Sequence, residues 1–260
     1  MRQHWWAFFL LALFATPVQA GRTLTDDSGR TVQLPGPAQR IVALAPHITE
    51  VLYTAGAVDK IVGTVDYSDY PPAARRIPRV GGYSRIDLEA VLALRPDLVI
   101  VWESGNNMAQ ADKLRALGLP VYVSQPNRLA DIARQIERYG ELAGTEVTAR
   151  PAAQAFRQRL NALQAAHQGK PKVRVFYQVW KAPLITVGKA QIISDAMHVC
   201  GGSNIFDALT SMAPRVSLEA VIAADPEVII ATGMAEGRPE WLSDWEKWPR
   251  LTAAARDDLF

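Results

Sequence analysis

Apolar and polar positions follow a pattern that occurs twice in this chain, 130 residues apart. Residues 86–102, IDLEAVLALRPDLVIVW, match residues 216–232, VSLEAVIAADPEVIIAT, at seven of seventeen positions. Each copy starts with apolar residues at helical spacing, meets a proline, and continues as an apolar run typical of a buried parallel strand. Because the offset is the size of one domain and too long for a solenoid repeat, the pattern predicts two similar lobes.

Other apolar runs fit the same plan of alternating strands and helices. We expect further strands at residues 40–45, 60–65, 120–123 and 173–178, and helices at residues 48–55 and 108–117. Alternation of this kind favours an α/β fold with mainly parallel sheets.

The middle of the chain is strongly helical, over residues 129–143 and again from about residue 152 to 167. The second segment carries an apolar stripe that we assign to Ala155, Phe156, Leu160 and Leu163. About 20 helical residues span some 30 Å, enough to join two lobes as a rigid helix that permits little closure. We therefore expect an N-terminal lobe over 21–145, a connecting helix over 146–170 and a C-terminal lobe over 171–260.

The first twenty residues predict export. Arg2 precedes an apolar run from Trp5 to Phe14, and small residues lead to an expected cleavage site after Ala20. The run is shorter than the roughly 20 apolar residues that cross a bilayer. No cysteine lies near the cleavage site, so we expect a periplasmic protein that is not a lipoprotein.

Charge and composition exclude some classes of function. The formal net charge is +2, and basic residues form no run of five, which argues against nucleic-acid binding. The three histidines after residue 20 lack metal-ligand spacing, and no phosphate loop, nucleophile elbow or dinucleotide fingerprint is present. We expect no metal site, no catalytic residues and no enzyme activity.

Aromatic side chains gather where the predicted strands end. Ligands of open α/β sheets bind at these carboxyl ends, and the residues found there are Tyr67, Tyr70, Tyr83, Trp102 and Trp180. Such rings suit a large, partly apolar ligand held by stacking, although any one of them could instead be a core residue. His47 follows the first predicted strand and is a further candidate for a ligand contact.

Glu89 and Glu219 occupy the same place in the two copies of the repeat, at the start of equivalent helices. Helix N-termini stabilise carboxylates, and this alone could account for both residues. Alternatively, one carboxylate per lobe would match basic patches on a symmetric membrane partner.

The chain resembles the cobalamin-binding periplasmic proteins of ATP-driven importers, within the wider group of siderophore, haem and cobalamin binders. Four segments carry the resemblance: IVALAPHITEVLYTAG at 41–56, YSDYPPAA at 67–74, LEAVLALRPDLVIVW at 88–102 and VCGGSNIF at 199–206. The resemblance implies a helical-backbone fold and a monomer that captures cobalamin (vitamin B12) or a related corrinoid and delivers it to an ABC permease dimer. Cobalamin would be cargo, without any resident cofactor.

The resemblance also implies roles for individual residues. Tyr67 and Trp102 match ligand-contacting rings of the first lobe, and Tyr83 stands where the family has tryptophan. In the second lobe, family aromatics are replaced, and the corresponding wall would be formed by Val179, Ile185 and the neighbouring Trp180. An alternative is a haem or iron-siderophore binder with His47 or a tyrosine as axial ligand.

Two further expectations come from the same resemblance. Glu89 and Glu219 match surface glutamates that dock onto arginines of the permease. Cys200, the single cysteine, matches a half-cystine whose partner in the family lies in a final helix. That helix would follow Phe260, so we expect the C-terminal lobe to be truncated by about 30 to 40 residues and the disulfide partner to lie beyond Phe260.

Overall fold

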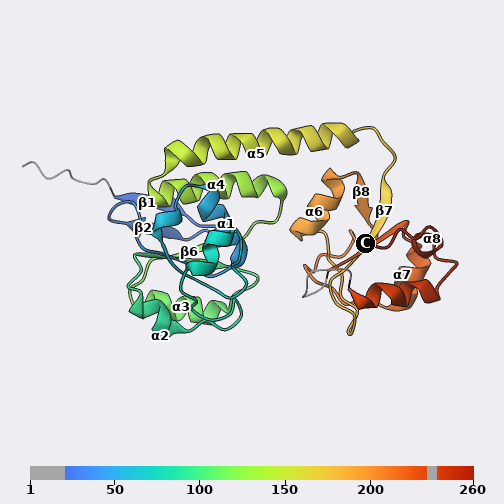
Figure 1. The fold of residues 1–260 in the computed structure, drawn as a ribbon, viewed down its shortest axis with the longest axis horizontal. Coiled ribbons are helices and arrows are strands. Elements are labelled where there is room, and N and C mark those ends of the chain that lie inside the picture. Colours follow the sequence, from blue (N-terminus) through green and yellow to red (C-terminus); the bar gives the residue numbers. More distant parts are fainter. Residues whose placement is uncertain (1–20, 233–238) are drawn as a thin grey trace, which may run out of the picture.

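Two α/β lobes lie side by side, and one long helix runs across both (Figure 1). The computed structural model describes residues 21–232 and 239–260. The expected signal peptide, residues 1–20, lies outside the described residues. The described part of the chain contains no helix that is long and apolar enough to cross a membrane.

The first lobe is built on a parallel sheet of four strands in the order β4-β3-β5-β6. Its strands are β3 (Ile41–Ala43), β4 (Ile61–Thr64), β5 (Leu98–Trp102) and β6 (Val121–Ser124). The accompanying helices are α1 (Pro46–Thr54), η1 (Val58–Lys60), η2 (Pro72–Arg76), α2 (Leu88–Ala93), α3 (Met108–Ala116) and α4 (Leu129–Ala143). An antiparallel hairpin, β1 (Arg22–Thr25) and β2 (Thr31–Leu34), precedes this sheet.

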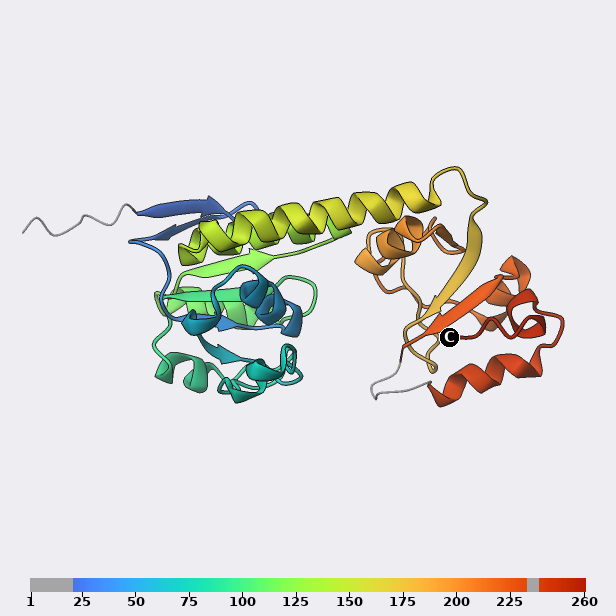
Figure 2. The same cartoon turned by 45° about the horizontal axis from the view of Figure 1, so that its top comes forward.

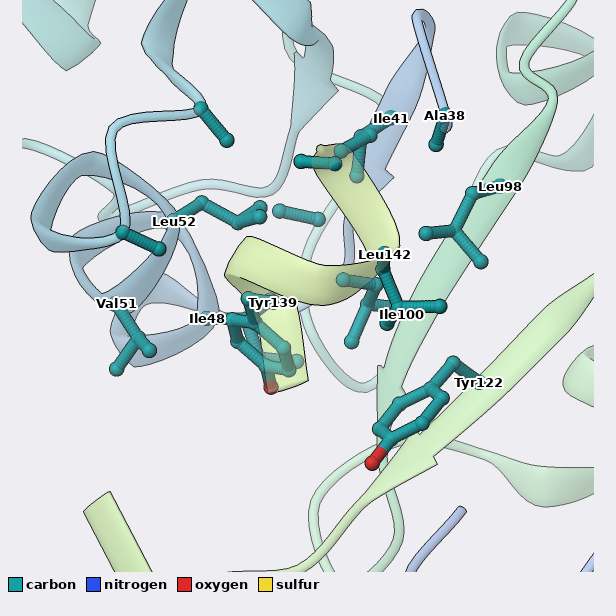
Figure 3. Close-up of a cluster of buried hydrophobic side chains, with 14 of the residues drawn as sticks. Ala38, Ile41, Ile48, Val51, Leu52, Leu98, Ile100, Tyr122, Tyr139 and Leu142 are labelled. Atoms are coloured by element: carbon teal, nitrogen blue, oxygen red, sulfur yellow. The ribbon is translucent and has the colours of Figure 1, made fainter. Parts of the chain in front are cut away.

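Both faces of the first sheet are buried. Ile41, Ile100 and Tyr122 point into one apolar cluster, with α1 and α4 (Figure 3). Val99 and Val101 point into a second cluster on the opposite face, as strand alternation requires. Burial on both faces explains why these strands read as continuous apolar runs in the sequence.

The second lobe repeats this arrangement. Its parallel sheet has the order β8-β7-β9, formed by β7 (Val173–Gln178), β8 (Gly202–Asn204) and β9 (Val228–Ala231). Leu259 pairs in parallel with Ile229, so residues 258–260 occupy the place that β6 has in the first lobe. The helices are α6 (Ile192–Val199), α7 (Leu218–Ala224), η3 (Glu240–Lys247) and α8 (Thr252–Ala255).

The sequence repeat corresponds to a structural repeat. Asp87 caps α2 by accepting a hydrogen bond from the Ala90 amide, and Ser217 caps α7 in the same way. After each helix comes a residue in the left-handed region, with φ 44° at Arg95 and 43° at Asp225. The expected fold class, two similar parallel α/β lobes joined by a long helix, is confirmed.

Helix α5 (Glu146–His167) connects the lobes, and it runs above both of them in the two views (Figures 1 and 2). It begins at residue 146, where the connecting helix was expected to begin, and six residues before the helical pattern expected from about residue 152; Pro151 lies on its exposed face. Its 22 residues span about 33 Å.

The apolar stripe predicted for α5 is partly wrong. Ala149, Ala153 and Leu160 are the buried residues of the helix, whereas Ala155 is exposed and Leu163 is 43% exposed. The expected stripe was assigned from residues 152–167 alone. Close contact with α4, which includes the earlier turns of the helix, determines which face is buried.

Candidate ligand-binding site

Three ring side chains meet at the carboxyl ends of the first-lobe strands. The rings of His47 and Trp102 are 5.1 Å apart between centroids in a T-shaped contact, and the rings of Tyr83 and Trp102 are 6.5 Å apart. His47 lies in the first turn of α1, Trp102 ends β5, and Tyr83 lies between β4 and α2. We call these three residues the aromatic platform. The structure thus brings together three of the residues predicted to contact the ligand.

Asn106 ties the segments of the platform together. Its side-chain amide donates hydrogen bonds to the carbonyl oxygens of Leu44 (2.8 Å) and Tyr83 (2.5 Å). Its Oδ1 accepts a hydrogen bond from the Trp102 amide at 2.6 Å. Asn106 is buried, so these bonds are shielded from water and hold the ends of β3 and β5 against the Tyr83 loop.

Gly105 allows the Trp102 ring to lie close to the backbone. A Cβ atom at Gly105 would lie 1.8 Å from Cε3 of Trp102, far inside van der Waals contact. Only glycine therefore permits the observed position of this indole ring. The Gly105–Asn106 pair that follows Trp102 in the sequence is explained as its support.

Tyr67 projects from a loop that is firmly anchored. Its side chain is 69% exposed and its φ is 63°, a left-handed conformation that few non-glycine residues adopt. Below it, Ser68 is buried and accepts a hydrogen bond from Thr64 Oγ1 at 2.8 Å. The Arg79 guanidinium donates to the carbonyl of Ser68 and to Asp69. An exposed ring on an anchored loop can contact a ligand without a large loss of conformational entropy.

The loops that carry Tyr67 and Tyr83 are neighbours. The Asp66 amide donates a hydrogen bond of 2.9 Å to the carbonyl oxygen of Gly81. Tyr83 is 43% exposed, and Tyr70 is 67% exposed. These tyrosines are therefore surface rings at the edge of the first lobe, and the possibility that they are core residues is ruled out.

A cavity of about 500 Å³ lies between the lobes beside the aromatic platform. Helices α1, α4 and α5 form its first-lobe side, and α6 forms part of its second-lobe side. The residues that line this inter-lobe cavity are His47, Glu50, Val51, Thr54, Trp102, Gln125, Pro126, Ile132, Gln135, Ile136, Phe156, Gln191, Ile192, Ile193 and Met212. Most were not predicted, because they come from four helices far apart in the sequence and share no motif.

Burial holds His47 in its neutral form. Desolvation lowers the pKa of His47 from 6.5 to about 4, since an imidazolium at this position would lose its hydration. Burial also raises the pKa of the nearby Glu50, again by desolvation. At neutral pH the imidazole is therefore uncharged and offers one nitrogen donor and one nitrogen acceptor.

The buried imidazole predicts a pH-dependent stability. The pKa of His47 falls on folding, so between pH 6.5 and pH 4 the unfolded chain binds more protons than the folded protein. Stability should therefore fall as the pH is lowered through this window, by about 3 kcal/mol from this group. Urea unfolding at pH 7 and pH 4.5 checks this. The pH dependence should be smaller in His47→Phe, and an unchanged dependence in that variant would contradict the assignment.

Val179 and Ile185, two of the residues predicted to contact the ligand, lie at the end of the central strand of the second lobe. Val179 is half-buried and packs against the cluster formed by Val175, Val187 and Met197. Ile185 is half-buried and pairs with Trp180 through backbone hydrogen bonds. Both side chains are aliphatic, so this part of the second lobe offers apolar contact without stacking.

Trp180 makes different contacts from Val179. Its ring lies 5.8 Å from that of Trp241, and its indole N–H donates to the carbonyl oxygen of Ala182. Trp180 is 42% exposed and does not line the inter-lobe cavity. Trp241, which sequence reasoning did not single out, thus forms a second aromatic pair with Trp180.

Glu89 and Glu219 are both exposed, each at the second position of its helix. Hydrogen bonds from its own backbone amide and from the Ser217 hydroxyl hold the pKa of Glu219 below its ordinary value. Helices α2 and α7 both lie on the side of the molecule opposite α5 (Figure 1). Two carboxylates are therefore presented one per lobe, on equivalent helices.

The remaining chemical candidates are few. Cys200 is an exposed free thiol, and the expected disulfide stays a prediction. The described residues contain no group of three His, Cys, Asp or Glu side chains placed to hold a metal ion.

Two lobes, a long connecting helix and a ring-lined site between them define a solute-binding protein of the helical-backbone class. A sequence comparison with known families matches residues 41–260 to the periplasmic binding protein family. The chain therefore belongs to the periplasmic binding protein family, whose members are binding proteins.

Among individual proteins, the chain is similar to vitamin B12-binding proteins. The vitamin B12-binding protein of Vibrio parahaemolyticus is 38% identical over 225 residues, which cover 85% of this chain and 80% of that protein. The vitamin B12-binding protein of Vibrio cholerae is 38% identical over 224 residues, covering 86% and 80%. The resemblance to cobalamin-binding proteins is thus confirmed.

Solved structures agree with this placement. The crystal structure of the periplasmic vitamin B12-binding protein of Vibrio cholerae superposes with a TM-score of 0.78 at 37% identity, covering 86% of this chain and 87% of that one. A periplasmic haem-binding protein from Roseiflexus superposes with a TM-score of 0.75 at 22% identity, covering 86% and 88%. The second likeness shows the shared fold alone.

Proposed function

We propose that this protein captures cobalamin, or a closely related corrinoid, between its lobes in the periplasm and delivers it to an ABC importer. The observation that carries the proposal is the identity of 38% to vitamin B12-binding proteins over 85% of the chain. The anchored rings of Tyr67, Tyr83 and Trp102 support it, because they suit a broad, partly apolar macrocycle. The ligand is cargo and leaves unchanged, so the protein carries out no reaction.

The connecting helix indicates how binding proceeds. Helix α5 packs along α4 over an extended contact, and Gly140 brings the two backbones so close that a Cβ there would lie 2.2 Å from Ala149 Cβ. The Leu129 amide also donates to Asp195 across the lobes at 2.8 Å. These contacts oppose a wide hinge motion, so the lobes present a largely preformed site that a monomer can use alone.

Delivery requires contact with a membrane partner, and Glu89 and Glu219 are the residues we assign to it. Both carboxylates are exposed and repeat on equivalent helices of the two lobes. A permease dimer with one basic patch per subunit would match this pseudo-twofold arrangement. Charges at the rim of such an interface mainly set registry and association rate.

A panel of ligands tests the choice of cargo. Cyanocobalamin in large excess should raise the unfolding midpoint by roughly 5 to 10 °C, because a bound ligand stabilises only the folded state. Haemin and a ferric siderophore should produce no comparable shift. A haemin-specific shift, with a red-shifted absorption band that disappears in His47→Phe, would favour the haem alternative instead.

A further inference from the structure

Two residues that line the inter-lobe cavity each have a buried polar side-chain atom without a hydrogen-bond partner. These are Nε2 of His47 and Oε1 of Gln135. Gln135 is 1% exposed, and its amide nitrogen already donates to Ser124 Oγ at 2.6 Å. An unpaired buried polar group costs free energy, so two such atoms beside one cavity indicate a place where a ligand completes the hydrogen bonding.

Among the described residues that line the same cavity, no other buried side-chain nitrogen or oxygen lacks a partner. Gln125 Oε1 accepts from the Ser104 amide, and its nitrogen donates to Asn127. Gln191 Oε1 accepts from the Ile193 amide, and the Thr54 hydroxyl donates to the Glu50 carbonyl. Within the described lining, the buried atoms without partners therefore belong to His47 and Gln135, which lie on α1 and α4 of the first lobe.

The walls of the cavity decide which chemical group fits. They are mainly apolar, with Val51, Ile136, Phe156 and Ile193 among them, and no lysine or arginine of the described residues lines the cavity. A ligand carboxylate would lose its hydration there without gaining a counter-charge, and Glu50 would repel it. An uncharged group with both a donor and an acceptor could instead pair with the imidazole and the amide oxygen.

We propose that the inter-lobe cavity is a subsite for a carboxamide arm of the ligand, with His47 and Gln135 as its hydrogen-bonding residues. The subsite thereby selects an amide over a carboxylate at that arm. This inference rests on the proposed function, since corrinoids carry peripheral carboxamides. It also explains how the site would reject haem, whose peripheral arms are carboxylates.

Cobalamin and its monocarboxylic acids, in which one peripheral amide is hydrolysed, are the probes. Titration calorimetry at pH 7 should show that the wild-type protein binds cobalamin at least about 10-fold more tightly than the isomer whose acid arm enters the cavity. His47→Phe keeps a ring against Trp102 but removes the hydrogen bond. It should weaken cobalamin binding by about 5- to 15-fold and reduce the preference over that isomer toward one.

Two further variants complete the test. Gln135→Met should lower the same preference, and it provides an independent measurement if His47→Phe is poorly folded. His167→Phe, a matched substitution at the end of α5 and outside the cavity, should leave both affinities unchanged. Tight cobalamin binding with a preference that neither variant alters would overturn the subsite alone. Failure of the wild-type protein to bind cobalamin would overturn the proposed function, and the subsite with it.

Discussion

Trp102→Ala is expected to weaken cobalamin binding by about 100-fold. Trp102 is the central ring of the aromatic platform, in contact with both His47 and Tyr83. Its removal deletes a large stacking surface and leaves the two neighbouring rings without support, and buried tryptophans at binding surfaces commonly contribute several kcal/mol. Titration calorimetry with cyanocobalamin at neutral pH measures the loss directly.

Gly105→Ala tests whether ligand binding depends on the position of the Trp102 ring, because the variant retains the ring but displaces it. The added methyl group would overlap the Trp102 indole, so the ring must move although it is retained. Binding should weaken by about 10-fold, whereas Gly118→Ala, at a left-handed turn (φ 85°) with nothing within 4 Å, should lower stability but leave affinity unchanged. Wild-type affinity in both Trp102→Ala and Gly105→Ala would show that the platform does not contact the ligand.

The double substitution Glu89→Ala with Glu219→Ala should separate capture from delivery. Both side chains are exposed and neither lines the inter-lobe cavity, so cobalamin affinity should change less than twofold. Uptake of radiolabelled cobalamin by cells that depend on this protein should fall at least about 10-fold, because two charged contacts to the permease are lost.

A control removes the same charge elsewhere. Asp59 and Glu141 are exposed acidic residues away from α2 and α7, and replacing both with alanine should leave uptake intact. An equal loss of affinity and uptake in the Glu89 and Glu219 variant would instead mean that these glutamates stabilise the lobes. Their position at helix N-termini, where carboxylates are favoured by the helix dipole, makes this the relevant alternative.

Much of the fold follows from the spacing of apolar and polar residues within single helices and strands, and those parts could be predicted from the sequence. The repeat was visible because each lobe buries the same helix and strand, and β7 and α4 match the expected ranges. The hairpin of β1 and β2 was missed because its strands have four residues each and only one face packs. The helical pattern in α5 was expected only from about residue 152, after Pro151, yet the helix begins at residue 146 and its N-terminal turns are held against α4 by tertiary contact.

The candidate site divides in the same way. The rings of Tyr67, Tyr83 and Trp102 follow strands, and the carboxyl ends of parallel strands necessarily meet at one edge. The roles of Asn106 and Gly105 as supports needed coordinates, since both depend on backbone positions across the sheet. The inter-lobe cavity could not be predicted, because its walls come from segments spread between His47 and Met212 that share no motif.

The second lobe remains the place where the sequence is least informative about the ligand. Val179 and Ile185 provide an aliphatic surface, while the Trp180 ring contacts that of Trp241. Ligand preference is therefore expected to depend chiefly on the first lobe and on the cavity beneath α5. We therefore assign capture mainly to Trp102 and Tyr83, which Asn106 and Gly105 hold in place.

Calorimetric titration of the purified protein with cyanocobalamin tests the central proposal most directly. We expect saturable heat with one ligand bound per chain and a dissociation constant of about 1 μM or tighter, as a preformed, ring-lined site allows. No heat, together with no rise in the unfolding midpoint at ligand excess, would contradict the proposal that this protein captures cobalamin.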